Sequence, residues 1–464
     1  MVMTPWATRF MELSDGVVEA RTRFTPSPLL NLDAYPTYEA ANLLWNTLRE
    51  IFILTPRTLK VIRRILVEAS AYSGQAYSDQ KVFKSRLYNP IVDPLPAICL
   101  TGPAGVGKST LLKAMSRLFD ETGYIDVGGG HNLPMRTFFY YKVYRGCRDT
   151  QILQAFIESC LVLPLKEGDV IEDDPKKPPQ PETVKSVTRA LALAQRLAAR
   201  DGIAAVILDE LQFLTQSTVA NTAVTATLLG MTYLGPPLVF SSNYDMVHRL
   251  KQRGQQDRDR LLSRHVPLLP EMLAVPEDFQ AWKAYLEECI VVSGGALAFN
   301  PGNDAESLHF YTFGLRRKLL DLFRIAYGHA RQQGRYAATM QDIEWAYCSG
   351  EYCEHRVDVE ELISIQLGRP SSRKDLIFPF EMDAEETQVR TEEQEARHFE
   401  KVTDQATAAS LSPAEKRSYV AAGGTVKGAK ESGRKPSGEK RKKAPPRTLE
   451  SLLEGGRKRY GQEG

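Results

Sequence analysis

A glycine-rich motif at residues 102–109 constrains the fold of this chain more than any other feature. Its sequence, G-P-A-G-V-G-K-S, has the form G-x-x-x-x-G-K-[ST]; an apolar run at 97–100 precedes it and helix-forming residues at 109–115 follow it. Strand, glycine-rich loop and helix are the context in which this motif binds nucleotide phosphates. The glycines let backbone N–H groups turn toward phosphate oxygens, and the helix adds the positive end of its dipole. The sequence therefore predicts an α/β fold built around a bound nucleoside triphosphate.

The polar side chains of the motif have separate expected tasks. Lys108 is expected to reach the β- and γ-phosphates of ATP, and the Ser109 hydroxyl to bind Mg²⁺. The residues that we expect to contact ATP are Gly102, Pro103, Ala104, Gly105, Val106, Gly107, Lys108, Ser109 and Thr110.

Bulk properties narrow the class of protein. A length of 464 residues allows two or three domains. The six cysteines lie mostly in apolar or helical patterns, which is typical of reduced thiols in a cytoplasmic protein. Cys348, Cys353 and His355 cluster, but three ligands at uneven spacing make a poor zinc site. No segment has the ~20 apolar residues of a membrane span and the N-terminus does not resemble a signal peptide, so we expect a cytoplasmic protein without membrane contact.

Apolar runs alternate with helical patterns on both sides of the motif. Strand-like segments occupy residues 136–144, 203–208, 237–243 and 266–270, and helical periodicity occupies residues 150–163 and 184–197. Strands that alternate with helices favour a parallel sheet with helices on both faces. We therefore predict a parallel five-stranded sheet, interrupted by an exposed acidic and proline-rich insertion at residues 164–182.

The two ends of the chain differ in character. Helical patterns occupy residues 38–54, 56–72 and 276–367, whereas acidic residues dominate 381–400 and Lys and Arg dominate 427–459. Neither charged block holds enough apolar residues to fold alone, so we predict a mostly disordered tail. The predicted divisions are an N-terminal helical docking segment (1–94), an α/β core (95–270), a helical lid (271–370) and the charged tail (371–464).

Polar residues follow two of the predicted strands. Asp209 is expected to hold Mg²⁺, and Glu210 to accept a proton from the water that attacks the γ-phosphate. Asn243 is predicted to orient that water, although an Asn in this place is also a common cap for the helix that follows. These residues favour hydrolysis over simple nucleotide binding.

Arginines in two places are candidates for contacts with phosphate. Arg258, Arg260 and Arg264 precede the last predicted strand, where one of them can neutralise charge on the γ-phosphate of a neighbouring copy. We favour Arg264 or Arg260, and an exposed basic helix end is the competing interpretation. In the lid, Arg317, with Arg316 as substitute, opens a helix and is expected to contact the bound phosphates.

Together, the phosphate-binding loop, the Asp-Glu pair, the strand-end Asn, the arginines and the Gly-x-x-Arg of residues 314–317 resemble an AAA+ ATPase over residues ~95 to 365. Within that group the chain is similar to transposition regulators of the TnsC/TniB type, close to the initiator and helicase-loader clade. The cues are a proline-rich approach to the loop, the segment 211–213 after the Asp-Glu pair, and the sequence V-F-S-S-N-Y at 239–244.

This resemblance implies an AAA+ P-loop fold with a helical lid, and an ATP-dependent ring or helical filament that coats duplex DNA. It also implies a target-selection protein at one end of the coat, a transposase at the other, and release of the coat by ATP hydrolysis. DNA contact in such proteins comes from the segment after the phosphate-loop helix, here 136–148, so the candidates are Lys142, Arg145 and Arg148. The tail suggests an arm that binds transposase subunits, or a basic block that binds DNA directly.

Two alternatives stay open. A replication initiator or helicase loader shares all of the catalytic parts but recruits a replicative helicase. A nucleotide-gated scaffold only changes conformation with ATP, and Glu210 argues against it because a scaffold has little use for a general base.

Overall fold

The computed structural model describes residues 8–88, 93–119, 123–126, 132–144, 147–161, 186–211 and 218–381. Its central feature is a sheet of five parallel strands in the order β4-β5-β6-β1-β7. The strands are β1 (Ile98–Thr101), β4 (Phe138–Lys142), β5 (Ala205–Asp209), β6 (Leu238–Ser242) and β7 (Arg264–Pro267). A separate antiparallel hairpin pairs β2 (Gly123–Asp126) with β3 (Asn132–Met135). The predicted parallel five-stranded sheet is confirmed.

The strands send alternate side chains to opposite faces of the sheet. Val206 and Leu208 of β5 enter one hydrophobic cluster, and Ile207 between them enters another. This alternation is the two-residue period of a strand, and helices must cover each apolar face. The first face is covered by α7 (Asp149–Leu161), α8 (Val187–Arg200), α9 (Thr218–Met231), α10 (Tyr244–Leu250) and α11 (Gln255–Leu261), and the second by α2 (Asp15–Thr22), α4 (Pro56–Ala76) and α6 (Lys108–Ser116).

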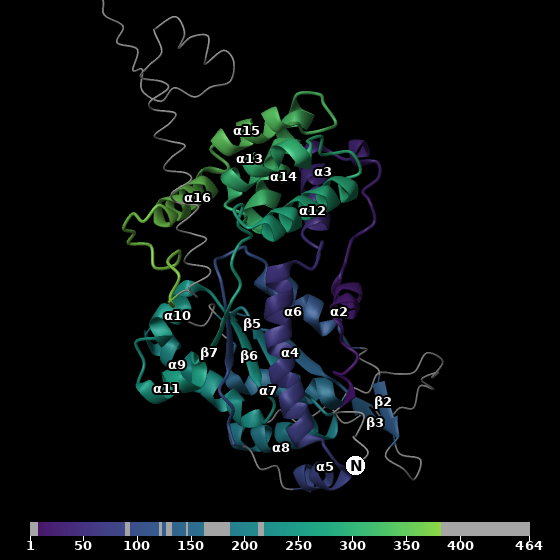
Figure 1. Cartoon of the computed structure of the whole chain (residues 1–464), viewed down its shortest axis with the longest axis vertical. Helices are drawn as coiled ribbons and strands as arrows, with labels where there is room; N and C mark the ends of the chain where they lie inside the picture. The colour runs from purple at the N-terminus through teal and green to yellow at the C-terminus, as the bar shows by residue number, and fades with distance from the viewer. Residues whose placement is uncertain are drawn as a thin grey trace, which may run out of the picture. The chain divides into compact units, whose positions relative to one another are not determined.

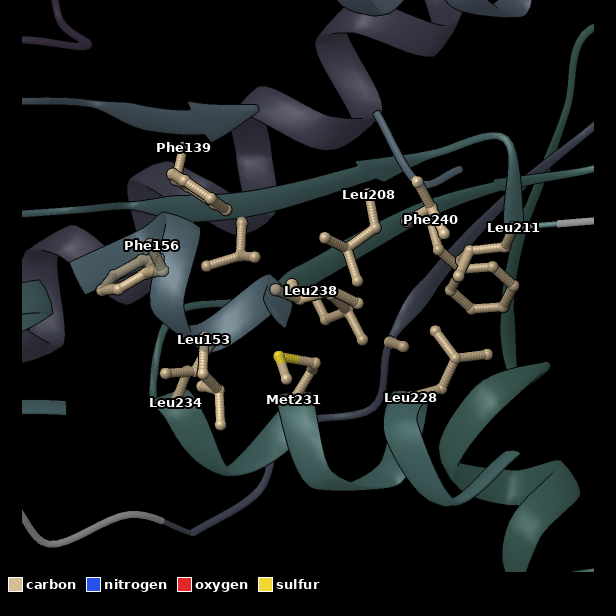
Figure 2. Packing of buried hydrophobic residues seen from close by; sticks show 14 of the residues in the cluster. Phe139, Leu153, Phe156, Leu208, Leu211, Leu228, Met231, Leu234, Leu238 and Phe240 are labelled. Carbon is tan, nitrogen blue, oxygen red and sulfur yellow. The ribbon is translucent and has the colours of Figure 1, made fainter. Parts of the chain in front are cut away.

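Figure 2 shows the packing on the first face. Phe139 of β4 meets Phe156 of α7 edge to face, with ring centroids 4.8 Å apart. Leu208, next to the end of β5, and Phe240, in the middle of β6, belong to the same buried cluster. Full burial of one such side chain contributes about 1.5–3 kcal/mol. The cluster therefore holds β5 and β6 in place near the ends that carry the candidate site.

The fifth strand begins earlier than the sequence predicts. The prediction placed it at residues 266–270, but β7 begins at Arg264, which pairs with Ile98 of β1. Pro267 ends the strand, and Pro270 within the predicted range also has no N–H to donate to a neighbouring strand. Arg264 is therefore the first residue of β7 rather than part of the segment before it.

Five helices follow the sheet: α12 (Pro276–Val292), α13 (Pro301–Thr312), α14 (Arg316–Gln332), α15 (Met340–Cys348) and α16 (Cys353–Gln366). We call them the lid. The helices α12 to α15 share a buried cluster that includes Trp282, Leu286 and Phe323, whereas Leu362 of α16 belongs to the cluster on the second face of the sheet. The N-terminal helix α3 (Thr37–Leu48) contributes Leu44 and Leu48 to the cluster of α12 to α15, and lies beside α12 and α14 in Figure 1.

The N-terminal helices are thus divided between two cores. α3 packs in the lid, whereas α4 packs on the sheet through residues such as Ile62 and Ile65. Thr55 starts α4 with a capping box, and Pro56 fits its first turn. The short helix α5 (Gln80–Tyr88) follows α4. The predicted domain boundaries stay predictions.

Other sequence predictions have mixed outcomes. All six cysteines are free thiols, and Cys99, Cys147, Cys160 and Cys289 are buried. Within the described ranges, no helix has the length and apolar character needed to cross a membrane. The predicted insertion at 164–182 and the charged blocks at 427–459 and, except for its first residue, at 381–400 lie outside the described residues.

Candidate nucleotide-binding site

The glycine-rich loop joins β1 to α6 and has the backbone geometry that its glycines allow. Gly105 and Gly107 have φ angles of 85° and 109°, which side chains rarely tolerate, and Gly107 is the residue before the first turn of α6. At Gly102 an added Cβ would lie 2.3 Å from the carbonyl oxygen of Leu268. The loop therefore sits tightly against the chain that leaves β7, and the N-terminus of α6 points its N–H groups into it.

Lys108 is the first residue of α6, and its ammonium lies within the loop. Nζ donates hydrogen bonds to the carbonyl oxygens of Gly102, at 2.7 Å, and Pro103, at 3.0 Å. Burial and, to a smaller extent, the positive charge of Arg317 lower the pKa of Lys108 to about 8, against the opposing effect of Asp209 and Glu210.

Asp209 is the last residue of β5 and is fully buried. Its Oδ1 accepts hydrogen bonds from the Ser241 hydroxyl and from the backbone N–H of Glu210, and its Oδ2 accepts one from Tyr140 Oη at 3.0 Å. A carboxylate has about four acceptor positions. Among the described residues three are used, which leaves capacity on Oδ2 for a metal-bound water. This carboxylate and the Ser109 hydroxyl are hard oxygen donors and suit Mg²⁺.

Glu210 has a left-handed backbone with a φ angle of 61°. A non-glycine residue held there costs on the order of 1 kcal/mol, and such strain persists only where the surroundings fix it. Here the Glu210 N–H donates to Asp209 Oδ1 at 2.9 Å and to Ser241 Oγ at 3.0 Å. The turn aims the carboxylate away from β5, and Oε1 lies 3.3 Å from Nζ of Lys142. Sequence reasoning assigned Lys142 to DNA and missed this ion pair.

Asn243 follows β6, the strand between β5 and β1. Its side-chain oxygen accepts a hydrogen bond from the Met246 N–H at 3.1 Å, so Asn243 caps α10. The cap uses the oxygen of the side-chain amide and leaves its NH₂ group as a donor for other partners. Capping and orientation of a water by the NH₂ group are therefore compatible.

The two lid arginines point in different directions. The N–H of Arg317 donates to the Gly105 carbonyl oxygen at 3.2 Å, and a Cβ on Gly105 would lie 2.8 Å from that of Arg317. Its side chain is exposed. Arg316 is buried instead, where its guanidinium pairs with Glu271 at 3.1 Å and lies over the ring of Tyr285. Both arginines lie against the phosphate-binding loop, since a Cβ on Gly107 would lie 3.8 Å from Cδ of Arg316, but only Arg317 has an exposed side chain.

The three arginines around α11 also differ in their surroundings. Arg264 pairs with Glu68 of α4 at 2.6 Å, and Arg260 donates to the Tyr233 hydroxyl at 3.2 Å. Arg258 is exposed, and among the described residues no hydrogen bond or ion pair involves its guanidinium. The preference of the sequence for Arg264 or Arg260 stays a prediction, and of the three arginines Arg258 is the one with an exposed side chain.

The remaining residues considered for DNA contact or metal binding form no further site among the described residues. Arg148 is exposed just before α7, and Arg145 lies outside the described residues. His355 pairs with Asp321 at 3.2 Å. In the part of the chain that the structure describes, no three His, Cys, Asp or Glu side chains form a group that could hold a metal ion.

Comparison with known proteins adds to this geometry. Residues 96–235 match a family model described as an AAA domain. No curated protein matches the chain. Among solved structures, the Aeropyrum pernix ORC1 protein in complex with DNA is 16% identical, with 68% of this chain and 69% of that chain covered and a TM-score of 0.39.

Two further structures give similar values. The Aeropyrum pernix ORC2 protein is 16% identical, covering 65% of this chain and 73% of that chain with a TM-score of 0.36. The Thermotoga maritima RuvB Holliday junction branch migration motor is 10% identical, covering 66% and 75% with a TM-score of 0.33. The AAA domain match, the phosphate-binding loop and the parallel sheet make this an AAA+ P-loop fold with a parallel five-stranded sheet and many helices.

Proposed function

We propose that this chain is an ATP-dependent, DNA-binding AAA+ ATPase that regulates DNA transposition. It assembles on duplex target DNA and links a target-selection protein to the transposase, and ATP hydrolysis drives disassembly. The observation that carries the ATPase part is the position of Asp209 and Glu210 at the carboxyl end of β5, at the same edge of the parallel sheet as the loop after β1 that leads to Lys108, with Arg317 packed on that loop. The transposition part rests on the sequence resemblance of residues 211–213 and 239–244.

The catalytic step is transfer of the γ-phosphoryl group to water. The water oxygen forms a bond to phosphorus, the bond from phosphorus to the bridging oxygen breaks, and ADP leaves. Glu210 takes the proton of the attacking water, and the Asn243 NH₂ group holds that water in line. Ser109 and Asp209 would hold Mg²⁺, which when bound neutralises phosphate charge.

Lys108 and Arg317 bring positive charge to the phosphates. Both approach the same loop, one from α6 and the other from the lid. Without a nucleotide, repulsion between the two positive charges helps to lower the pKa of Lys108. The negative charge of ATP bound between them would offset this repulsion. Binding of ATP would therefore draw the lid and the core together.

In the assembled oligomer, a neighbouring copy supplies a further positive charge to the γ-phosphate. Arg258 is exposed on α11 and free of ion pairs among the described residues, so it can reach the γ-phosphate of a neighbouring copy. DNA contact is proposed for Arg148, for Arg145, and for Lys142 once Lys142 leaves Glu210. Contacts of Lys and Arg with phosphates are independent of base sequence and weaken with salt.

A Glu210→Gln variant tests the ATPase part, with Glu306→Gln on the exposed face of α13 as the matched control. We expect the Glu210 variant to bind ATP and assemble on duplex DNA while turnover falls by about 10²-fold or more. The control should behave like the parent. A parent without turnover would reject the enzyme and leave the scaffold alternative.

Electron microscopy with ATP, Mg²⁺ and duplex DNA tests assembly. A ring or filament that encloses DNA supports the proposal, and a monomer indifferent to DNA rejects it. Recovery of transposase subunits in a pulldown with the full chain separates a transposition regulator from an initiator or loader, which would recover a helicase instead.

A further inference from the structure

The chain returns from the lid to the sheet after α16 ends. Gly368, with a φ angle of 72°, turns the chain, and residues 373–381 run to α10 and β7 (Figure 1). We call residues 373–381 the latch. Its apolar part is the sequence L-I-F-P-F at 376–380, which lies within the predicted charged tail (371–464).

The core end of the latch is held through both backbone and rings. The Ile377 carbonyl oxygen lies 3.1 Å from Nε2 of His248, and Lys251 donates to the Pro379 carbonyl oxygen. Side chains on one helix thus bind the main chain of an extended peptide, which is a form of peptide recognition.

Aromatic contacts reinforce this attachment. Phe378 meets Tyr244 edge to face, with ring centroids 5.7 Å apart. Phe380 stacks on His265 of β7 at 3.8 Å and lies beneath the ammonium of Lys251 at 4.7 Å. Aromatic pairs contribute roughly 0.5–1.5 kcal/mol each beyond burial. Phe378 and Phe380 are partly buried, whereas Leu376 is buried in the hydrophobic cluster on the second face of the sheet, so the latch also packs against the core.

The lid end of the latch is held by ion pairs. Arg373 pairs with Asp358 of α16 at 2.9 Å, and Asp358 also pairs with Lys318 of α14 at 2.9 Å. Lys318 is buried, and it follows Arg317, whose backbone touches Gly105 of the phosphate-binding loop. The chain of contacts therefore leads from the latch to the loop.

Each end of the latch is thus linked to a residue that is next in sequence to one proposed to act at the bound nucleotide. Lys318 is adjacent to Arg317 at one end, and Tyr244 is adjacent to Asn243 at the other. We propose that the latch couples nucleotide binding to the start of the C-terminal tail, by tying the lid helix α16 to α10 when ATP brings Arg317 and Asn243 to the same phosphates. This coupling rests on the proposed binding of ATP.

These contacts indicate how release of the latch would affect closure of the lid and binding of ATP. Without the latch, the link from α14 and α16 to α10 through Arg373 and Phe378 is lost, so closure of the lid on ATP becomes less favourable. By linkage, whatever favours closure favours docking of the latch, and whatever pulls the latch away weakens ATP binding by the same factor. A partner that binds the tail and displaces the latch would therefore promote release of nucleotide.

Hydrogen–deuterium exchange of the full chain tests the coupling. We expect a non-hydrolysable ATP analogue with Mg²⁺ to slow exchange in residues 376–381 in the parent. In the double variant Phe378→Ala, Phe380→Ala these residues should exchange fast with and without the analogue. The dissociation constant of the analogue should rise about fivefold or more, the lower range of allosteric coupling.

Matched variants keep the test specific. Phe310→Ala removes a ring of the same size from the exposed face of α13, and should leave both measurements unchanged. At the lid end, Arg373→Ala should weaken binding of the analogue, whereas Arg369→Ala, an exposed arginine just before the latch, should not.

The results separate the latch from the proposed function. If the parent binds the analogue but residues 376–381 exchange at one rate with and without it, the latch proposal is rejected and the ATPase proposal stands. The latch is also rejected if the double variant binds the analogue as tightly as the parent. A parent that binds no ATP rejects the proposed function and the coupling with it.

Discussion

Nζ of Lys142 lies 3.3 Å from Oε1 of Glu210, and the register of β4 with β5 places Lys142 opposite Asp209. Lys142 is thus beside the proposed general base and also within the segment 136–148 that is proposed to contact DNA. The side chain of Lys142 is mostly exposed, so a DNA phosphate can compete with Glu210 for its ammonium. In this position the ammonium of Lys142 can pair with Glu210 or with a DNA phosphate.

Removal of Lys142 should therefore affect hydrolysis. In Lys142→Ala the Glu210 carboxylate loses its partner, so we expect turnover without DNA to rise and stimulation by DNA to shrink. An exposed ion pair is worth roughly 0.2–1 kcal/mol, which corresponds to an increase of at most about fivefold. Steady-state ATPase assays with and without duplex DNA measure both effects.

Arg148→Ala is the control for that variant, because Arg148 is an exposed candidate for DNA contact away from Glu210. It should weaken DNA binding and leave turnover without DNA unchanged. If the two variants behave alike, Lys142 acts only through DNA and the pair with Glu210 has no role in hydrolysis.

The pKa of Lys108 predicts how nucleotide binding depends on pH. Burial lowers this pKa to about 8, and a phosphate binds the protonated ammonium better than the neutral amine. ATP affinity should therefore be full below this pKa and fall as the pH rises through it. In Arg317→Ala a neighbouring positive charge is lost, so the fall should move to higher pH while binding at neutral pH becomes weaker.

Titrations with a fluorescent ATP analogue over a range of pH values measure this shift. Arg369→Ala, which changes a lid arginine away from the loop, serves as the control and should keep the pH profile of the parent. A profile that stays in place in Arg317→Ala would mean that the two cations do not interact across the loop.

Arg258 provides a test of catalysis between subunits. Arg258→Ala should fold and bind ATP normally, yet lose turnover in the assembled state, because the missing cation belongs to the neighbour's site. Mixed with Glu210→Gln, it should regain part of the activity, since each chain supplies what the other lacks. Arg264→Ala should instead lower the melting temperature, because it leaves Glu68 of α4 without this partner. Absence of recovery in the mixture would argue against Arg258.

The sequence predicted the sheet because motif chemistry and strand period are local signals. The loop at residues 102–109 and the runs before Asp209 and Asn243 predicted the strands whose ends meet. The contact of Lys142 with Glu210 could not be predicted in this way, because it depends on the register between β4 and β5 and on the left-handed turn at Glu210.

The latch was missed for a related reason. Its apolar run at residues 376–380 is too short to form a core alone, and its location next to charged sequence favoured an assignment to the tail. Only the fold shows that His248, Lys251 and His265 bind it. Similarly, α3 has the helical periodicity that sequence predicts, but nothing in that pattern indicates that it packs with lid helices.

A carboxylate in the lid predicts loss of stability in acid. Asp342 is buried at the start of α15, where it accepts hydrogen bonds from Arg335, from His329 at 2.9 Å and from both N–H and hydroxyl of Thr339. Burial alone would raise the pKa of Asp342, but the hydrogen bonds outweigh it and hold the pKa well below its usual range. A carboxyl with a lowered pKa in the folded state stabilises the fold above its unfolded pKa of about 3.9.

This stabilisation is lost as the pH falls from about 4 toward the lowered pKa. Asp342→Asn should cost about 1–3 kcal/mol at neutral pH, since hydrogen bonds to a charged group are replaced by weaker ones and Arg335 loses its partner. The difference in melting temperature between parent and variant should therefore shrink below about pH 4. Calorimetry of the two proteins from neutral to acid pH measures it, with Glu306→Gln as the exposed control. A difference that stays constant across this range would show that the carboxylate charge of Asp342 contributes nothing to the lid.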